Sequence, residues 1–186
     1  MSAFYKIAYQ VGFHPWEDLA DHPPFGRALD VGSGSGVWGV RLAQRGWDVT
    51  SVELVAKAVA RARKRVAAAD VQMRIVRADV TKLRAGSVGT GFRFILDTGT
   101  FHGLTEPQRA AMGREITAVA ADDATVLLDV FAPRRRGPLP RGATASDIES
   151  AFPAWHITDV EVADTDPDPI ALKLKFDEHW YRLRRK

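Results

Sequence analysis

The sequence predicts an α/β protein of one domain: a three-layer α-β-α sandwich around a seven-stranded, mostly parallel, Rossmann-like sheet. Short apolar runs alternate with amphipathic helical stretches, which is the pattern of βαβ units. A glycine-rich turn follows the first apolar run directly. At 186 residues, with no cysteine, the chain has the length of a single domain that needs no disulfide framework.

The stretch from 27 to 54 is the opening βαβ unit of this sheet. Residues 28–31 form an apolar run that predicts a buried strand, and Gly32-Ser33-Gly34-Ser35-Gly36 follows it. Apolar residues at helical spacing then predict a helix that Gly46 ends. The second strand covers 48–52 and finishes at Glu53.

The spacing of the glycines distinguishes a site for a dinucleotide from a site for a ligand with an ammonium group. A dinucleotide fingerprint, G-x-G-x-x-G, would place its third glycine at position 37, which is Val37. The chain has instead D-x-G-x-G-x-G from Asp30 to Gly36, and the carboxylate before the turn would repel a pyrophosphate and attract an ammonium group. Glu53, about twenty residues after the turn, is placed to accept hydrogen bonds from two ribose hydroxyls.

With both acids in place, this stretch resembles motif I and the ribose-binding acid of the class I S-adenosylmethionine-dependent methyltransferases. The resemblance implies that S-adenosyl-L-methionine is the cofactor and S-adenosyl-L-homocysteine the product. In the resembled family an acid at position 79 accepts from the adenine amine, although a turn cap is an alternative role for it. The implied cofactor-binding residues in the core of the domain are Asp30, Gly32, Ser33, Gly34, Gly36, Glu53, Leu54, Asp79, Val80 and Asp97.

The remaining elements follow in the order of such a fold. Strands are expected at residues 71–78, 92–96, 124–131, 155–162 and roughly 171–184, and helices at 55–69, at 105–120 and after the loop 132–142. Thr105 to Gln108 reads as a capping box for one helix, and Ser146 to Glu149 for the last one, which Pro153 ends. In the resembled fold the last two strands form an antiparallel hairpin, with the final strand beside the fifth.

The central strand ends in Asp97-Thr98-Gly99-Thr100-Phe101-His102-Gly103-Leu104, at the edge of the sheet where doubly wound folds bind ligands. The segment resembles the fourth-motif region of the thiopurine and tellurite-resistance methyltransferase groups, and it lacks the N/D-P-P-Y/F of enzymes that methylate exocyclic amines. This implies a small-molecule acceptor. Asp97 and His102 are the catalytic candidates, as a partner of the cofactor and as a general base. A turn-stabilising aspartate and a helix-capping histidine are the alternatives.

Residues 1–25 predict a helical cover ahead of the core at 26–186. Its H-P-W-E stretch looks like the entry segment of the same methyltransferase groups, so Trp16 is expected to bind the cofactor or to anchor the core. Position at the carboxyl edge makes His14, Phe101, His102 and Phe131 the candidates that line the acceptor pocket.

Composition limits the partners. The net charge of +3 and a pI near 9.4 allow a nucleic-acid partner, but the basic residues are spread along the chain, which favours a solvated basic surface over a nucleic-acid site. Arg134 to Arg136 form a solvated loop or bind an anionic group on the acceptor. No His/Asp cluster has metal-ligand spacing, so no metal is expected. The chain shows no signal-peptide core and no apolar run of membrane length, which predicts a cytoplasmic protein.

Three other functions remain open on the sequence. The first is an RNA or protein methyltransferase, whose basic loop would form one continuous surface with the helix at 55–69. The second is a nicotinamide oxidoreductase, which Val37 disfavours. The third is a non-catalytic module that binds S-adenosylmethionine. The sequence does not predict the acceptor atom (O, S or N) or the oligomeric state.

Overall fold

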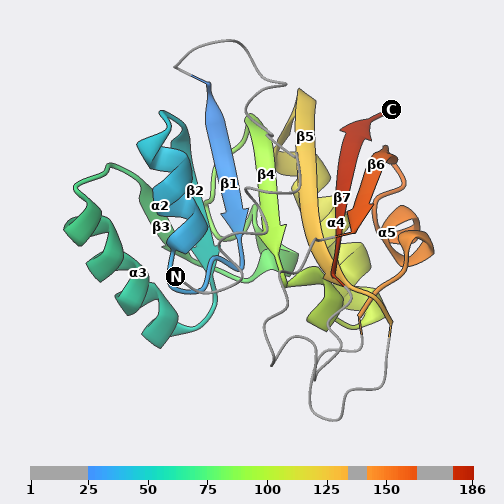
Figure 1. Ribbon diagram of the computed structural model, residues 1–186, viewed down its shortest axis with the longest axis horizontal. Coiled ribbons are helices and arrows are strands. Elements are labelled where there is room, and N and C mark those ends of the chain that lie inside the picture. Colours follow the sequence, from blue (N-terminus) through green and yellow to red (C-terminus); the bar gives the residue numbers. More distant parts are fainter. Residues whose placement is uncertain (1–24, 134–141, 163–177) are drawn as a thin grey trace.

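The computed structural model describes residues 25–133, 142–162 and 178–186 (Figure 1). The strands are β1 (Arg27–Val31), β2 (Asp48–Glu53), β3 (Arg74–Arg77), β4 (Phe92–Thr98), β5 (Ala120–Phe131), β6 (Trp155–Val162) and β7 (Glu178–Arg185). The helices are α2 (Val37–Gln44), α3 (Ala56–Ala69), α4 (Glu106–Val119) and α5 (Ala145–Ala151), with 3₁₀ turns at Val80–Lys82 and Phe101–Gly103. No described helix is long and apolar enough to cross a membrane.

The strands form one seven-stranded sheet in the order β3-β2-β1-β4-β5-β7-β6. The pairs from β3 to β5 are parallel, and β7 is antiparallel to both of its neighbours, β5 and β6. This confirms the predicted fold, including the insertion of the final strand beside the fifth. Because the strands from β1 to β5 run in parallel, their carboxyl ends meet at one edge, and the amino end of β7 joins them there.

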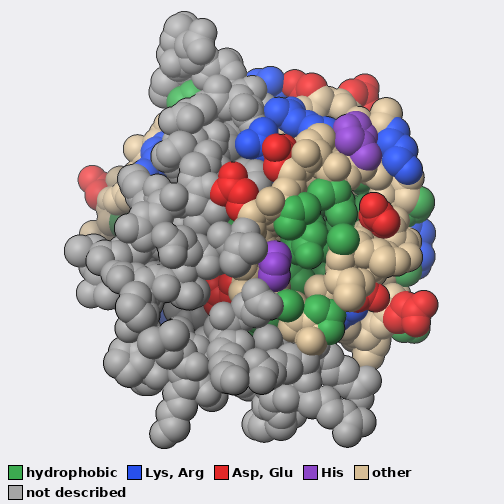
Figure 2. Space-filling model, turned by 45° about the vertical axis from the view of Figure 1, so that its right-hand side comes forward, with side chains coloured by type: hydrophobic (Ala, Val, Ile, Leu, Met, Phe, Trp, Pro, Cys, Tyr) green, Lys and Arg blue, Asp and Glu red, His purple; other side chains and the backbone are tan. Residues whose placement is uncertain are grey.

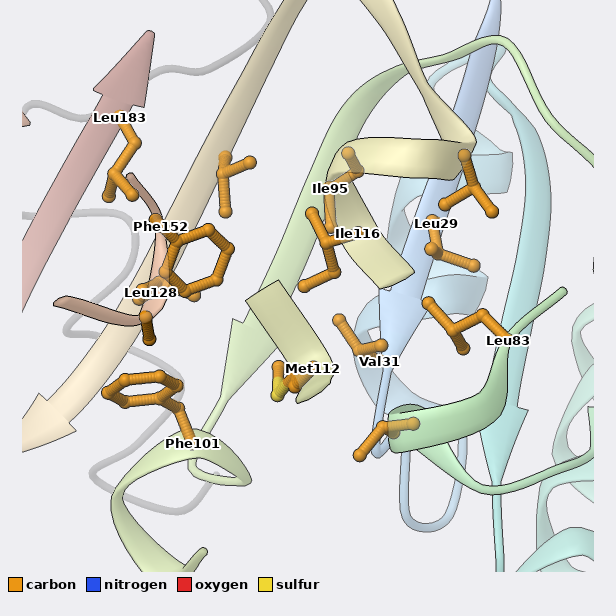
Figure 3. Packing of buried hydrophobic residues seen from close by; sticks show 14 of the residues in the cluster. Leu29, Val31, Leu83, Ile95, Phe101, Met112, Ile116, Leu128, Phe152 and Leu183 are labelled. Atoms are coloured by element: carbon orange, nitrogen blue, oxygen red, sulfur yellow. The ribbon is translucent and has the colours of Figure 1, made fainter. Parts of the chain in front are cut away.

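Helices cover both faces of the sheet. On one face Leu42 of α2 packs with a cluster that includes Phe94 and Trp180, and on the other α4 and α5 bury the larger cluster. Figure 3 shows this larger cluster, with Ile116 of α4 lying toward Leu29 and Ile95 of the sheet. The central strand β4 is buried on both faces over most of its length, as its near-continuous apolar run predicts.

Some boundaries differ from those that the sequence predicts. The fifth strand begins at Ala120 rather than Ala124, because charged side chains tie its first residues to neighbouring strands: Asp123 pairs with Arg93 at 2.8 Å, and Asp122 with Arg185 at 3.3 Å. The third strand is shorter than expected. The predicted cover at 1–25 lies outside the described residues except for Phe25, as does the turn before β7.

The two predicted capping boxes have different outcomes. At α4 the predicted box is present, and Gln108 Oε1 accepts from the Thr105 backbone N–H at 3.0 Å. At α5 the prediction of Ser146 was wrong, because Thr144 is the capping residue. Its hydroxyl accepts from the Asp147 N–H at 3.1 Å, and the Asp147 carboxylate accepts from the Thr144 N–H at 2.7 Å. This register turns Ile148 into the core.

Candidate active site

Five buried acids lie along the carboxyl edge of the sheet, one on each of five adjacent strands. In sheet order they are Glu53 on β2, Asp30 on β1, Asp97 on β4, Asp129 on β5 and Glu178 on β7. None is more than 9% exposed. The sequence predicted the first three as site residues and missed the last two. The one indication for Asp129 in the sequence is that this acid interrupts an apolar run near the end of a buried strand.

The glycine turn after β1 combines close packing with an open side. Gly32 has φ +61° and lies so close to Thr100 that a Cβ would overlap its hydroxyl, which brings the turn against the loop after β4. Gly34 has φ +54°, but a Cβ there would meet no atom within 4 Å. The turn therefore needs glycine for its backbone conformation at Gly34 and leaves free space at the same place, where a ligand can approach the backbone.

Glu53 connects the turn to the start of α3. Its Oε2 accepts from the Gly34 N–H at 2.8 Å, and its Oε1 accepts from the Val55 N–H at 2.7 Å. The side chain is 9% exposed. Since a carboxylate oxygen has two lone pairs, each oxygen keeps one for a further donor. The two backbone donors fix the carboxylate where the sequence predicts the ribose hydroxyls.

Asp30 is completely buried beneath the turn. Its Oδ2 accepts from the Ser51 hydroxyl at 3.1 Å, while its Oδ1 is buried without a hydrogen-bond partner. Burial raises the pKa of Asp30 from 3.8 to about 7, and the charges of Asp97 and Glu53 add to this increase. A buried acceptor without a donor costs free energy, and a ligand that carries an ammonium group would offset that cost.

Asp97 supports the loop after the central strand. Its Oδ1 accepts from the Thr100 N–H and its Oδ2 from the Phe101 N–H, both at 2.8 Å. Burial raises its pKa from 3.8 to about 6, although these two hydrogen bonds act in the opposite direction. The contacts are those of the turn-stabilising aspartate that the sequence left as an alternative. Contact with the cofactor or the transferring methyl group stays a prediction.

His102 joins this loop to the end of β5. Its Nδ1 accepts from the Phe131 N–H at 3.2 Å, and its ring stacks on the Phe131 ring with centroids 4.3 Å apart. Because Nδ1 is the acceptor, the proton of the neutral imidazole is on Nε2. In this arrangement Nε2 is a donor, whereas a general base needs an unprotonated nitrogen. The position is at the predicted edge, but the bond to β5 is a structural role.

Asp79 caps the 3₁₀ turn after β3. Its Oδ1 accepts from the backbone N–H of Thr81 at 2.8 Å and from the Thr81 hydroxyl at 2.7 Å. The Thr81 backbone N–H is the main cause that holds the pKa of Asp79 below 3.8. Oδ2 makes no hydrogen bond with the described residues, so the cap and the predicted adenine contact are compatible.

The other predicted site residues are placed as follows. Phe101 is completely buried and packs on Phe152 in the core, with ring centroids 5.9 Å apart (Figure 3). Leu54 is 56% exposed, and Val80 is buried. The Ser33 hydroxyl, in the turn beside Gly34, is a buried atom without a hydrogen-bond partner. His14 and Trp16 lie outside the described residues.

Arg109 of α4 is a residue that the sequence did not predict for this region. Its guanidinium donates to the carbonyls of Phe101 and His102, each at 3.2 Å, and to that of Gly142 at 2.6 Å. It also pairs with Asp147 at 3.4 Å. One side chain thus fixes the loop after β4 to the segment that leads into α5. The contacts join residues distant in sequence, which is why no local pattern indicates them.

A parallel sheet of this strand order, a glycine turn after β1 and an acid that ends β2 are the features of a class I S-adenosylmethionine-dependent methyltransferase. The family comparison agrees. Residues 28–123, more than half of the chain, match the model of a methyltransferase domain, and the chain belongs to this family. The protein is therefore a methyltransferase whose cofactor is S-adenosyl-L-methionine. Among curated protein sequences, none matches the chain.

Solved structures of similar fold include several methyltransferases. A TehB-like S-adenosylmethionine-dependent methyltransferase from Corynebacterium glutamicum is 20% identical, over 86% of this chain and 80% of that one, with a TM-score of 0.67. An S-adenosylmethionine-dependent methyltransferase from Clostridium acetobutylicum is 11% identical over 99% of both chains, with a TM-score of 0.69. The 1,6-didemethyltoxoflavin-N1-methyltransferase of Burkholderia thailandensis is 19% identical, over 86% and 70%, with a TM-score of 0.67. At these identities the likeness shows the fold.

Proposed function

We propose that this methyltransferase acts on a small molecule, which it binds at the carboxyl edge of the sheet beside the glycine turn. The observation that carries the proposal is the row of buried acids on five adjacent strands at this edge, next to the open side of Gly34. Acids at strand ends leave a negative potential that suits a cofactor with a sulfonium and an ammonium group. Folding alone gains nothing from burying so many carboxylates together.

Each of three acids would bind a different part of the cofactor. The carboxylate of Glu53, held by two backbone donors, would accept the ribose hydroxyls. Asp30, whose Oδ1 has no donor, would meet the ammonium group directly or through water, and Asp79 would accept from adenine through its free Oδ2. The cofactor supplies an electrophilic methyl group. The chain has to hold that group in line with the acceptor atom and to exclude water.

Two observations support a small acceptor over RNA or a protein. On the described part of the face in Figure 2, lysine and arginine side chains lie beside acidic ones. The loop after the central strand also lacks the N/D-P-P-Y/F sequence. In addition, the enzyme of similar fold from Burkholderia thailandensis is named for a small heteroaromatic acceptor. The whole chain 1–186 would be one domain, with residues 1–25, including His14 and Trp16, as a cover over the site.

A titration tests the proposal in two stages. Calorimetry with S-adenosylmethionine, S-adenosylhomocysteine and NADH should give binding of the first two and none of the third. Formation of S-adenosylhomocysteine is then measured with small phenols, thiols and amines, and in parallel with total RNA and denatured protein as acceptors. Turnover with a small compound supports the proposal. Turnover with RNA or protein alone contradicts it, and cofactor binding without any turnover favours the non-catalytic alternative.

A further inference from the structure

Asp129 and Glu178 lie on one face of the sheet, at the β5–β7 end of the row of acids. Across the antiparallel pair β5 and β7, Asp129 is opposite Trp180, and Phe131 is opposite Glu178. Residues directly opposite share a face, so all four side chains point the same way, and the two acids are diagonal neighbours. On the other side, Asp129 is in register with Thr98, the residue that ends the central strand.

Both acids are buried: Asp129 is 7% exposed and Glu178 is 3% exposed. Within the described part of the chain, neither makes a hydrogen bond or an ion pair. Asp129 Oδ1 is a buried acceptor without a donor, and the indole Nε1 of Trp180, opposite it, is a buried donor without an acceptor. Buried polar groups are almost always satisfied in proteins, so the acceptor on Asp129 and the donor on Trp180 are available to a bound molecule.

The protonation of the pair follows from its surroundings. Burial raises the pKa of Asp129 well above its usual value, and the negative charges of Glu178 and then Asp97 raise it further. Burial also raises the pKa of Glu178. The pair therefore takes up a proton more readily than two exposed carboxylates would. Groups of this kind are suited to accept a proton from a substrate.

We propose that Asp129 and Glu178 form the acceptor subsite, where they bind a nitrogen acceptor, an amine or a ring N–H, and take the proton that the nitrogen loses. This inference rests on the proposed function and narrows it from O, S or N to nitrogen. Two carboxylates, with Asp97 nearby, would repel a carboxylate or phosphate on the acceptor. They would attract a nitrogen that gains positive charge as it is methylated.

The step balances without a further reactant. The nitrogen lone pair forms a bond to the methyl carbon as the carbon–sulfur bond breaks, and that bonding pair stays on sulfur. For an amine, the positive charge passes from sulfur to nitrogen, and the N–H proton then moves to the ionised carboxylate of the pair. For a ring N–H, whose lone pair belongs to the aromatic system, the proton moves to the carboxylate first, and the electron pair left on nitrogen forms the bond to the methyl carbon. His102 does not compete for this role, because its Nδ1 already accepts from the Phe131 N–H.

The test measures acceptor preference without requiring the natural substrate. The protein saturated with S-adenosylhomocysteine is titrated calorimetrically with benzylamine, benzimidazole, phenol, thiophenol and benzoate. The variants are Asp129→Asn and Glu178→Gln. Asp122→Asn is the matched control, since Asp122 lies on the same strand but at its other end, with its side chain fully exposed. Amide replacements remove buried charges without partners, so the melting temperature should not fall.

The wild type and Asp122→Asn should bind the nitrogen probes at least about tenfold more tightly than phenol, thiophenol and benzoate, and each variant of the pair should lose that preference. All four proteins should bind S-adenosylhomocysteine equally. Three results would overturn the inference alone. They are a wild type that binds none of the probes, a wild type that binds benzoate, phenol or thiophenol as tightly as the nitrogen probes, and a preference for nitrogen that survives in either variant of the pair. A wild type that fails to bind S-adenosylhomocysteine would overturn the proposed function with it.

Discussion

Replacing Asp30 by asparagine should remove a pH dependence of stability that the wild-type chain has. Asp30 is completely buried, its Oδ1 has no donor, and its pKa rises from 3.8 to about 7. Asparagine has nearly the same shape and cannot ionise. The substitution therefore changes the charge of this position and leaves its packing almost unaltered.

The size of the effect follows from linkage between protonation and folding. A rise from 3.8 to about 7 is about three pH units, each worth about 1.4 kcal/mol, which gives about 4 kcal/mol. Because the pKa of Asp30 is higher in the folded state than in the unfolded chain, protonated Asp30 stabilises the fold relative to the ionised form, and this contribution to the free energy of unfolding is complete below about pH 4. It is lost as the pH rises to about 7, since the unfolded chain ionises first.

Urea unfolding at about pH 4 and about pH 8 measures this difference. Between the two values the wild type should lose about 4 kcal/mol more free energy of unfolding than Asp30→Asn loses. Asp97, whose pKa is raised to about 6, contributes to the loss in both proteins, so comparing them isolates Asp30. The exposed-site control Asp122→Asn should behave as the wild type does. Equal losses in wild type and Asp30→Asn would refute the reasoning.

Three further substitutions test the turn and the loops. Gly34→Ala places a methyl group in open space, but at φ +54°, a conformation that strains a residue with a Cβ, so the free energy of unfolding should fall by about 1–2 kcal/mol. Calorimetry should also show a much weaker S-adenosylmethionine complex. Unchanged affinity would exclude close approach of the cofactor to this turn. Glu53→Ala should lower cofactor affinity by about 1–3 kcal/mol and also destabilise the fold, because the Gly34 and Val55 N–H groups lose their acceptor; intact binding would contradict the ribose assignment. Arg109→Lys retains the charge but not the three carbonyl contacts. The melting temperature should therefore fall, and the KM for an acceptor should rise while the cofactor Kd is unchanged. An unaltered KM would show that Arg109 does not position the loop.

The sequence alone determined the order of the helices and strands and three of the five buried acids at the carboxyl edge of the sheet. Apolar runs, glycines and capping residues act over a few positions, so β1, the turn, α2 and β2 could be predicted from residues 27–54. The acids Asp30, Glu53 and Asp97 each follow or end an apolar run. A parallel sheet then places them at one edge, which is why their location could be predicted without coordinates.

Local patterns were insufficient where two positions could serve equally well. Ser146 and Thr144 are both capping residues in type, and the packing of Ile148 against the core selected Thr144. For Asp97 and His102, the edge of the sheet could be predicted from the sequence, but the hydrogen-bond partners could not. Those partners are backbone N–H groups of Thr100, Phe101 and Phe131, whose directions depend on the loop conformation.

Only the tertiary structure brought together the residues of the proposed acceptor subsite. Asp129 and Glu178 become neighbours because β7 enters the sheet antiparallel to β5, in a register that places Trp180 opposite Asp129. Arg109 likewise acquires its role from carbonyls on two separate loops. Local sequence determines which segments become strands and where they end, whereas the pairing of distant segments depends on the whole core. The proposed cofactor-binding acids could therefore be predicted from motifs, and the proposed acceptor subsite required the fold.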